Sequence, residues 1–83
     1  MRGAPQYLLA IYIAQHRQDP PIPSGVIAEM LGRSPAAVTE MCQRLGEKGL
    51  VTYEPYEGVT LTDSGRELAT TLHETYVTVS WFF

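Results

Sequence analysis

The sequence predicts a mainly α fold with a small β-hairpin. Three observations predict it: apolar residues recur at helical spacing in four segments, glycine and proline stand between these segments, and two short β-branched runs flank the residues PYEG. The chain has 83 residues, enough for one domain over residues 1–83. Because folding at this size buries only roughly 60–65 % of the surface of the unfolded chain, we expect a thin core.

The composition is typical of a globular protein. Hydrophobic residues make up 45 % of the chain and charged residues 18 %, which excludes a disordered or collagen-like chain. The sequence has no apolar run of about 18 residues that would span a bilayer and no cleavage site after its first helical segment, so we expect a cytoplasmic protein with no membrane partner. A single cysteine, Cys42, cannot form an internal disulfide.

The first helix is expected from Pro5 to about Arg17, because proline is favoured in the first turn of a helix. Its apolar residues cover a broad surface and predict that the helix is largely buried: Leu8, Ile11, Tyr12 and Ile13. Residues 19–23 contain three prolines, so we expect a connector there, with at most a short extended piece at Ile22.

Two further helices are expected on either side of a tight turn. The second begins at Ser24 and ends at Gly32, where glycine adopts the left-handed conformation that ends helices. The third begins with Ser34 as its capping residue and Pro35 at its first position, and continues to a stop after Lys48. One stripe of the third helix is apolar and should face the core: Val38, Met41, Cys42 and Leu45.

The rest of the chain predicts a hairpin and a last helix. The segments LVTYE and VTLT flank PYEG, so we expect a β-hairpin from Leu50 to Leu61. Thr62 fits the cap of the last helix, and Ser64 with Glu67 offers an alternative capping box. The tail YVTVSWFF also alternates as a strand does, so helix and strand both remain open beyond Tyr76.

The order of these elements predicts a winged helix-turn-helix, in which the second helix of the motif typically enters the major groove of DNA. Close packing across the turn needs a small residue, a glycine and a β-branched residue, and Ala28, Gly32 and Val38 stand at those places. The adjoining core positions are expected to be filled by Ile27, Leu31 and Met41.

The run IAEMLGRSPAAVTEMCQRLGEKGLVTYEPYEGVTLTDSGRELA resembles the DNA-binding domain of the diphtheria toxin repressor family, the metal-responsive regulators of iron and manganese uptake. Similarity in QYLLAIY extends this to the first helix, while LTDSGREL is also similar to multiple-antibiotic-resistance-type winged helices. The resemblance implies a transcription regulator that binds double-stranded DNA as a homodimer on a partly palindromic operator, with the wing near the DNA backbone.

By position, the family's DNA-facing stretch corresponds to the start of the third helix: Ser34, Ala36, Ala37, Thr39 and Glu40. Hydroxyls there can bind phosphate, and alanines can touch thymine methyl groups. Glu40 has two interpretations, an acceptor for a cytosine amino group or a solvated surface residue. Further DNA contacts are expected from five more residues: Arg33, Gln43, Arg44, Lys48 and Tyr56.

The charge of the chain opposes DNA binding. The formal net charge is −3, whereas phosphate neutralisation requires a basic surface, which here rests on one short segment that contains Arg33, Arg44 and Lys48. The wing also carries Glu57 where family members commonly have a basic residue. The alternative function is therefore a protein-interaction module without specific DNA binding. An enzyme is not expected, because no nucleophile with a positioned base and no glycine-rich phosphate loop occur.

Two tyrosines of the hairpin are the remaining candidates for wing contacts. Either Tyr53 and Tyr56 contact DNA or they cover the packing face of the hairpin, and the second interpretation fits Tyr53 better.

The positions that the resemblance assigns to metal ligands hold Gln6, Leu9, Tyr76 and Ser80, none of them a strong ligand for iron or manganese. We therefore expect no metal site and no cofactor, and hence a regulator that has lost the metal sensor of the family. His73 is expected to be exposed to solvent, and Cys42 to be buried as a packing residue.

The end of the chain is too apolar to be left in water without a reason. Pairing of the first and last helices of two subunits would bury it, with the last helix at about residues 62–83; alternatively, the aromatic residues fold back on their own domain. We expect a symmetric homodimer that spaces two recognition helices by roughly 34 Å. Its predicted interface consists of Leu8, Tyr12, Leu72, Tyr76, Val79, Trp81, Phe82 and Phe83.

Overall fold

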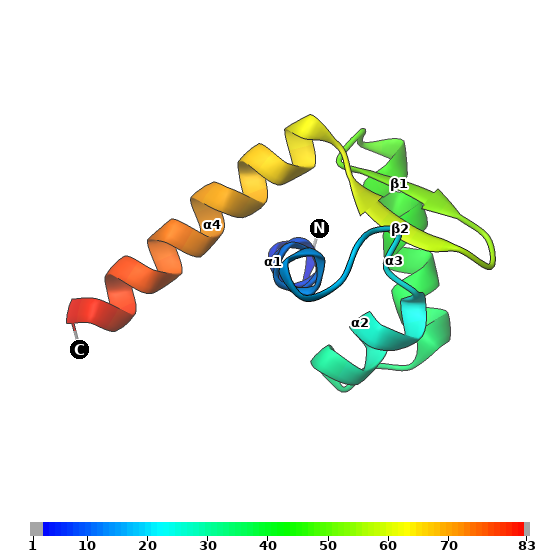
Figure 1. Cartoon of the computed structure of the whole chain (residues 1–83), viewed down its shortest axis with the longest axis horizontal. Helices are drawn as coiled ribbons and strands as arrows, with labels where there is room; N and C mark the ends of the chain where they lie inside the picture. The colour runs from blue at the N-terminus through cyan, green and yellow to red at the C-terminus, as the bar shows by residue number, and fades with distance from the viewer. Residues whose placement is uncertain (1–2, 83) are drawn as a thin grey trace.

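The structure, a computed structural model, describes the backbone of residues 3–82 and the side chains of residues 3–74. Its elements in chain order are α1 (Ala4–Arg17), α2 (Ser24–Leu31), α3 (Pro35–Glu47), β1 (Val51–Glu54), β2 (Gly58–Leu61) and α4 (Asp63–Phe82). Figure 1 shows α1 end-on near the centre, with α2, α3 and the hairpin on one side and the long α4 on the other. The predicted mainly α fold with a small hairpin is confirmed.

The connector after α1 joins the hairpin through one short extended piece. The N–H of Ile22 donates to the carbonyl of Val59 at 2.8 Å, and the N–H of Val59 donates back at 2.9 Å. The Ile22 side chain is fully buried. The extended piece expected at Ile22 therefore ties α2 to the hairpin.

The turn between α2 and α3 is built as its sequence predicts. Gly32 lies in the left-handed region with φ 64°, and the N–H groups of Gly32 and Arg33 both donate to the carbonyl of Ala28. Ser34 then caps α3, because its Oγ accepts from the N–H of Ala37 at 3.2 Å. Short-range chemistry thus fixes where α3 begins.

The hairpin pairs β1 and β2 antiparallel, with Val51 opposite Leu61 and Tyr53 opposite Val59. The N–H of Glu57 donates to the carbonyl of Glu54 at 3.1 Å, and Tyr56 has φ 69°. A proline at the second position of the turn and a positive φ at the third position define a type II turn, in which the third residue is usually glycine.

Thr62 caps α4, as predicted, and it also anchors this helix to the end of α3. Its Oγ1 accepts from the N–H of Gly65 at 3.1 Å and donates to the carbonyl of Gly49 at 2.7 Å. Ser64 lies inside the helix, so Thr62 is preferred over the capping box of Ser64. Beyond residue 76, where helix and strand remained open, the backbone is helical.

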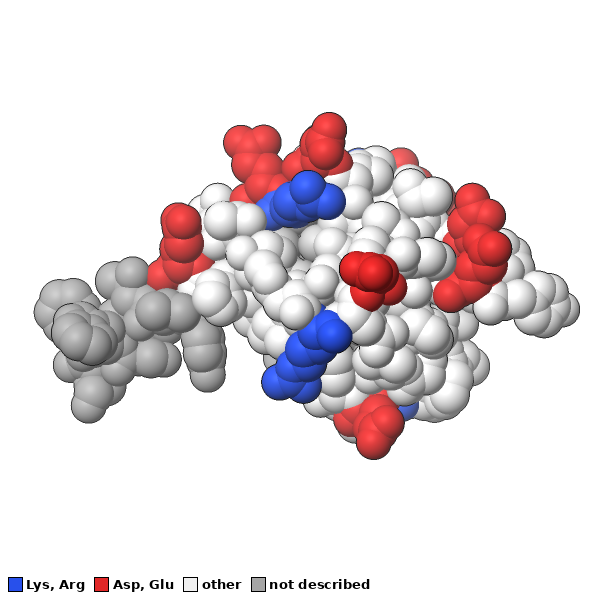
Figure 2. All heavy atoms as spheres, viewed as in Figure 1, with Lys and Arg blue, Asp and Glu red and all other residues white. Residues whose placement is uncertain are grey.

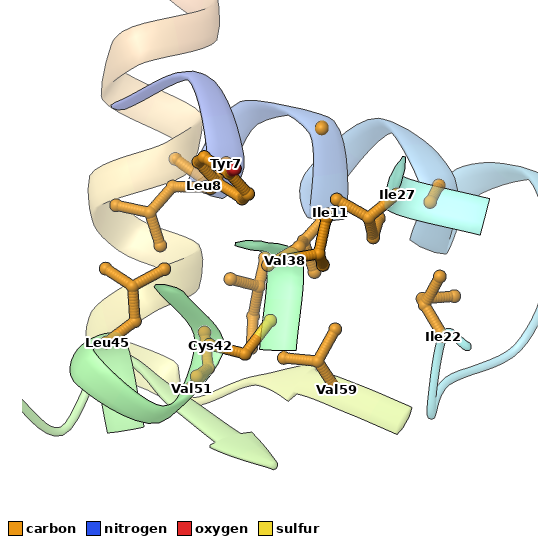
Figure 3. Packing of buried hydrophobic residues seen from close by; sticks show 14 of the residues in the cluster. Tyr7, Leu8, Ile11, Ile22, Ile27, Val38, Cys42, Leu45, Val51 and Val59 are labelled. Atoms are coloured by element: carbon orange, nitrogen blue, oxygen red, sulfur yellow. The ribbon is translucent and has the colours of Figure 1, made fainter. Parts of the chain in front are cut away.

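The core lies where α1, α3 and the hairpin meet, and Figure 3 shows side chains from all three pointing toward one another. It contains Tyr7, Leu8, Ala10, Ile11, Ala14, Ile22, Ile27, Ala28, Val38, Cys42, Leu45, Val51, Val59, Leu61 and Ala69. The prediction of Leu8 as an interface residue needs correction, since its side chain is only 1 % exposed within its own chain and offers a partner nothing to cover. Leu31 and Met41 are half-buried at the edge of this core.

Candidate nucleic-acid interface

The outer side of α3 and the residues around it form one continuous surface. The buried stripe of α3, made of Val38, Cys42 and Leu45, fixes the helix against the core, so its opposite side faces outward. Seven predicted contact residues are exposed there: Arg33, Ser34, Ala36, Glu40, Gln43, Arg44 and Lys48. Ala37 and Thr39 are half-buried at its edge. We call these nine residues the α3 surface.

The start of α3 suits an anion. The first turn of a helix carries a partial positive charge. In α3 the N–H groups of Ala37 and Val38 are bonded to Ser34 and the first residue is a proline, so the N–H of Ala36 is the one left to meet a ligand. Ser34 uses its Oγ as the acceptor for Ala37, which leaves the hydroxyl proton available for donation to a phosphate oxygen. Ala36 is exposed, and its methyl side chain is small enough to let a ligand approach the backbone.

The charges of the α3 surface are mixed. Arg44 and Glu40 form an ion pair one helical turn apart, with 2.9 Å between Nη2 of Arg44 and Oε1 of Glu40. Arg44, predicted as a phosphate contact, is thus already engaged by a carboxylate. On the face drawn in Figure 2, blue cationic atoms are scattered among red anionic ones and form no continuous basic surface.

The wing places one aromatic side chain fully in solvent. Tyr56 is 107 % exposed relative to its reference state, whereas Tyr53 is half-buried against the core, as the sequence favoured. Glu54 and Glu57 are exposed on either side of the turn. The wing therefore presents a phenol between two carboxylates.

A groove runs between the wing and the α3 surface. It is lined by Pro23, Ser24, Thr39, Tyr53, Tyr56, Glu57 and Gly58. Ser24 is not among the predicted contact residues, although its place at the start of a helix of the motif is visible in the sequence. The structure brings Ser24 and Thr39, 15 residues apart in the chain, to the same groove.

On the opposite side of the domain, α4 crosses α1 and packs against it. The ring of Tyr12 contacts His16 edge-on at 4.6 Å between centroids and His73 at 5.5 Å. His73 is half-buried by this contact, which corrects the expectation that it is exposed. Tyr12 and Leu72 are half-buried, so each keeps some surface. The other predicted interface side chains lie outside the described ones: Tyr76, Val79, Trp81, Phe82 and Phe83.

Two of the four positions that the resemblance assigns to metal ligands have described side chains. Gln6 is exposed and offers an amide, and Leu9 is half-buried and offers no donor atom. Tyr76 and Ser80 lie outside the described side chains. Across the part of the chain whose side chains are described, no three His, Cys, Asp or Glu residues come together as a candidate metal site.

Cys42 is a packing residue. Its side chain is fully buried, and this burial raises the pKa of the thiol from 9.0 to about 11. Within the described residues, no helix is long and apolar enough to cross a membrane.

Residues 1–59 match the family described as the iron dependent repressor, N-terminal DNA binding domain. The chain belongs to this family. It is 38 % identical over 76 residues to the uncharacterized HTH-type transcriptional regulator MJ0568 of Methanocaldococcus jannaschii, covering 92 % of this chain and 61 % of that protein. It is 48 % identical over 42 residues to the HTH-type transcriptional regulator MntR of Lysinibacillus sphaericus, covering 51 % of this chain and 30 % of that one. The resemblance to the diphtheria toxin repressor family is confirmed.

The fold is also similar to that of a solved regulator. MepR, a transcription regulator of the Staphylococcus aureus multidrug efflux pump MepA, superimposes with a TM-score of 0.75 at 22 % identity, covering 99 % of this chain and 62 % of MepR. In its complex with DNA the TM-score is 0.67 at 19 % identity, covering all of this chain and 65 % of MepR. This confirms the winged helix-turn-helix fold. The chain spans less than two thirds of the length of each of these relatives.

Proposed function

We propose that this chain is a sequence-specific transcription regulator that binds double-stranded DNA with α3 in the major groove. The observation that carries the proposal is the α3 surface: the helix is fixed by its buried stripe and capped at Ser34, and its outer side is left to contact a ligand. Membership of a DNA-binding domain family supports it, as does the similarity to two proteins named as transcriptional regulators.

The residues of this surface divide into two chemical groups. Ser34, Arg33 and Lys48 are suited to phosphate oxygens, which position a protein on the duplex without reading its sequence. Ala36, Glu40 and Gln43 have side chains that can meet base edges: a methyl group for thymine, an acceptor for cytosine and an amide for adenine. The base-edge group lies on the exposed outer side of α3, which a major groove about 12 Å wide can admit, and the phosphate group lies just before and just after this helix.

We further propose that the regulator is a homodimer on a partly palindromic operator. Two recognition helices roughly 34 Å apart would enter successive major grooves on one side of the duplex. The interface would combine the surface left on Tyr12 and Leu72 with the last part of α4. Leu68, 42 % exposed on the same helix, extends this apolar surface.

The proposed regulator does not depend on iron or manganese. Gln6 and Leu9 support this, because an amide and an alkyl side chain cannot replace carboxylate or thioether ligands. In a regulator that depends on a metal, removal of the metal by a chelator changes the affinity for DNA. For this chain, we expect a chelator to leave the affinity for DNA unchanged.

A protein-interaction module is the second candidate, and the wing favours it. Glu54 and Glu57 beside the fully exposed Tyr56 would repel phosphates and suit a partner with basic groups. The two functions differ in salt dependence, because DNA affinity falls steeply as salt rises when several phosphates are neutralised.

The test is fluorescence anisotropy with a duplex selected by this protein from a random-sequence library, measured at several salt concentrations, with and without chelator. We expect selective, salt-sensitive binding that a chelator does not change. Lys48→Gln should weaken binding to all duplexes and reduce the slope of log affinity against log salt by about one.

Arg17→Gln is the matched control, since it also removes one exposed cation but lies at the end of α1, beside Glu29 and Met30 of α2 and outside the α3 surface. It should leave the slope nearly unchanged. Selection of no sequence even at low salt would refute the DNA-binding proposal, and loss of binding with chelator would refute metal independence.

A further inference from the structure

The ion pair between Glu40 and Arg44 stands at the centre of the α3 surface. Nη2 of Arg44 lies 2.9 Å from Oε1 of Glu40, and the two side chains are 56 % and 65 % exposed. Exposed pairs at this spacing contribute little to the free energy of unfolding, because water screens their charges. The fold therefore does not depend on this pair.

The pair weakens the attraction of this surface for DNA in general. Among the three cations of the segment, Arg33, Arg44 and Lys48, one is neutralised within the protein. The carboxylate of Glu40 also meets the phosphates of any duplex as a like charge. A duplex that offers nothing to this carboxylate is consequently bound poorly.

A cytosine in the major groove changes this balance. Its N4 amino group is a hydrogen-bond donor exposed at the base edge, and glutamate is a side chain that accepts from it. A carboxylate has about four acceptor positions on its two oxygens, so Glu40 can receive cytosine N4 while it keeps its bond to Arg44. Arg44 then offsets the negative charge that would otherwise be left near the phosphates.

We infer that Glu40 selects a cytosine in each half of the operator and that its pair with Arg44 suppresses binding to other DNA. This inference rests on the proposed function and adds the base that one side chain selects. It predicts that specificity arises because binding to other sequences is weakened, since few cations attract the protein to DNA of random sequence.

The test compares Glu40→Ala with Glu47→Ala on duplexes selected by the wild-type protein. Glu47 is also an exposed glutamate of α3 and lies at its last residue, so both variants remove one negative charge from the same helix. Affinities are measured for the selected duplex, for duplexes in which each cytosine pair is replaced in turn by a thymine pair, and for an unrelated duplex.

For the wild type and Glu47→Ala, we expect one replaced cytosine in each half-site to lower affinity roughly tenfold or more. Glu40→Ala should lose this preference at that position and bind the unrelated duplex more tightly than the wild type. Circular dichroism should show unchanged helicity for both variants, because the pair is exposed.

The outcomes separate the inference from the function on which it rests. Selective binding by the wild type with an undiminished cytosine preference in Glu40→Ala would overturn the role of Glu40 and leave the DNA-binding function standing. A preference lost equally in Glu47→Ala would overturn it as well, because the effect would come from charge alone. Absence of selective binding by the wild type would overturn both.

Discussion

Replacing Gly65 with alanine should strongly destabilise the domain, although alanine favours helices. An ideal Cβ built on Gly65 would lie 1.8 Å from the carbonyl oxygen of Leu50 and 2.9 Å from its carbonyl carbon. Both atoms belong to the backbone, so no side-chain rotation can relieve the overlap. The start of α4 or the turn after α3 must move by more than roughly 1 Å, since a real Cβ is not found closer than 3.0 Å to such atoms.

The cost follows from what holds that carbonyl in place. The oxygen of Leu50 accepts from the N–H of Thr62 at 3.1 Å, and the N–H of Leu50 donates to Leu45 at 3.0 Å. Overpacking typically costs about 1–3 kcal/mol, and a weakened hydrogen bond about 1 kcal/mol more. The helix preference of alanine returns up to about 1 kcal/mol. We expect the free energy of unfolding to fall by about 1–4 kcal/mol, which lowers the Tm by roughly 4–30 °C in a domain of this size.

Urea and thermal unfolding followed by circular dichroism measure this change. Gly25→Ala is the control, because Gly25 also lies in a helix and has no heavy atom within 4 Å of an added Cβ. It should leave stability unchanged or raise it by up to about 1 kcal/mol. Surface substitutions typically change the free energy of unfolding by less than about 0.5 kcal/mol. If the value for Gly65→Ala lay within that range of the wild-type value, the close approach of α4 to Leu50 would be refuted.

Two further predictions concern Cys42 and Tyr56. Burial raises the pKa of Cys42 to about 11, so the unfolded chain releases the thiol proton at a lower pH than the folded chain does. The free energy of unfolding should therefore fall by up to about 3 kcal/mol as the pH rises from about 9 to about 11. Urea unfolding across this range measures the fall, which should be shallower in Cys42→Ala; equal slopes would contradict the assignment. Tyr56→Gly should raise the free energy of unfolding by about 1 kcal/mol in urea, because glycine adopts the φ of 69° without strain; a lower stability would mean that the ring packs on the domain.

The sequence was sufficient wherever structure is decided by neighbouring residues. Gly32, Ser34 and Thr62 act through hydrogen bonds to atoms a few residues away, so their roles could be predicted from residue type and order. The pair of Glu40 and Arg44 has the same local character, and its spacing of four residues on one helix is a sequence signal for such an ion pair.

Tertiary packing decided the features that the sequence did not predict. The apolar surface of α1 is too broad to show which side meets its own core, and the structure assigns Leu8 to the core and leaves Tyr12 at the edge. His73 is covered by the ring of Tyr12, 61 residues earlier in the chain. Gly65 resembled an ordinary residue in the first turn of a helix, because the carbonyl that excludes a side chain comes from Leu50.

These contacts connect the recognition helix to the proposed dimer interface. The end of α3 leads into a turn at Gly49 and Leu50, and this turn is bonded to Thr62 and packed on Gly65 at the start of α4. The start of α4 is therefore fixed to the end of α3 without a flexible linker, and packing against α1 sets the direction of α4. In a dimer formed through α1 and α4, a rotation at the interface would move the recognition helix with it, so the spacing of the two half-sites would depend on the packing between Thr62, Gly65 and the turn.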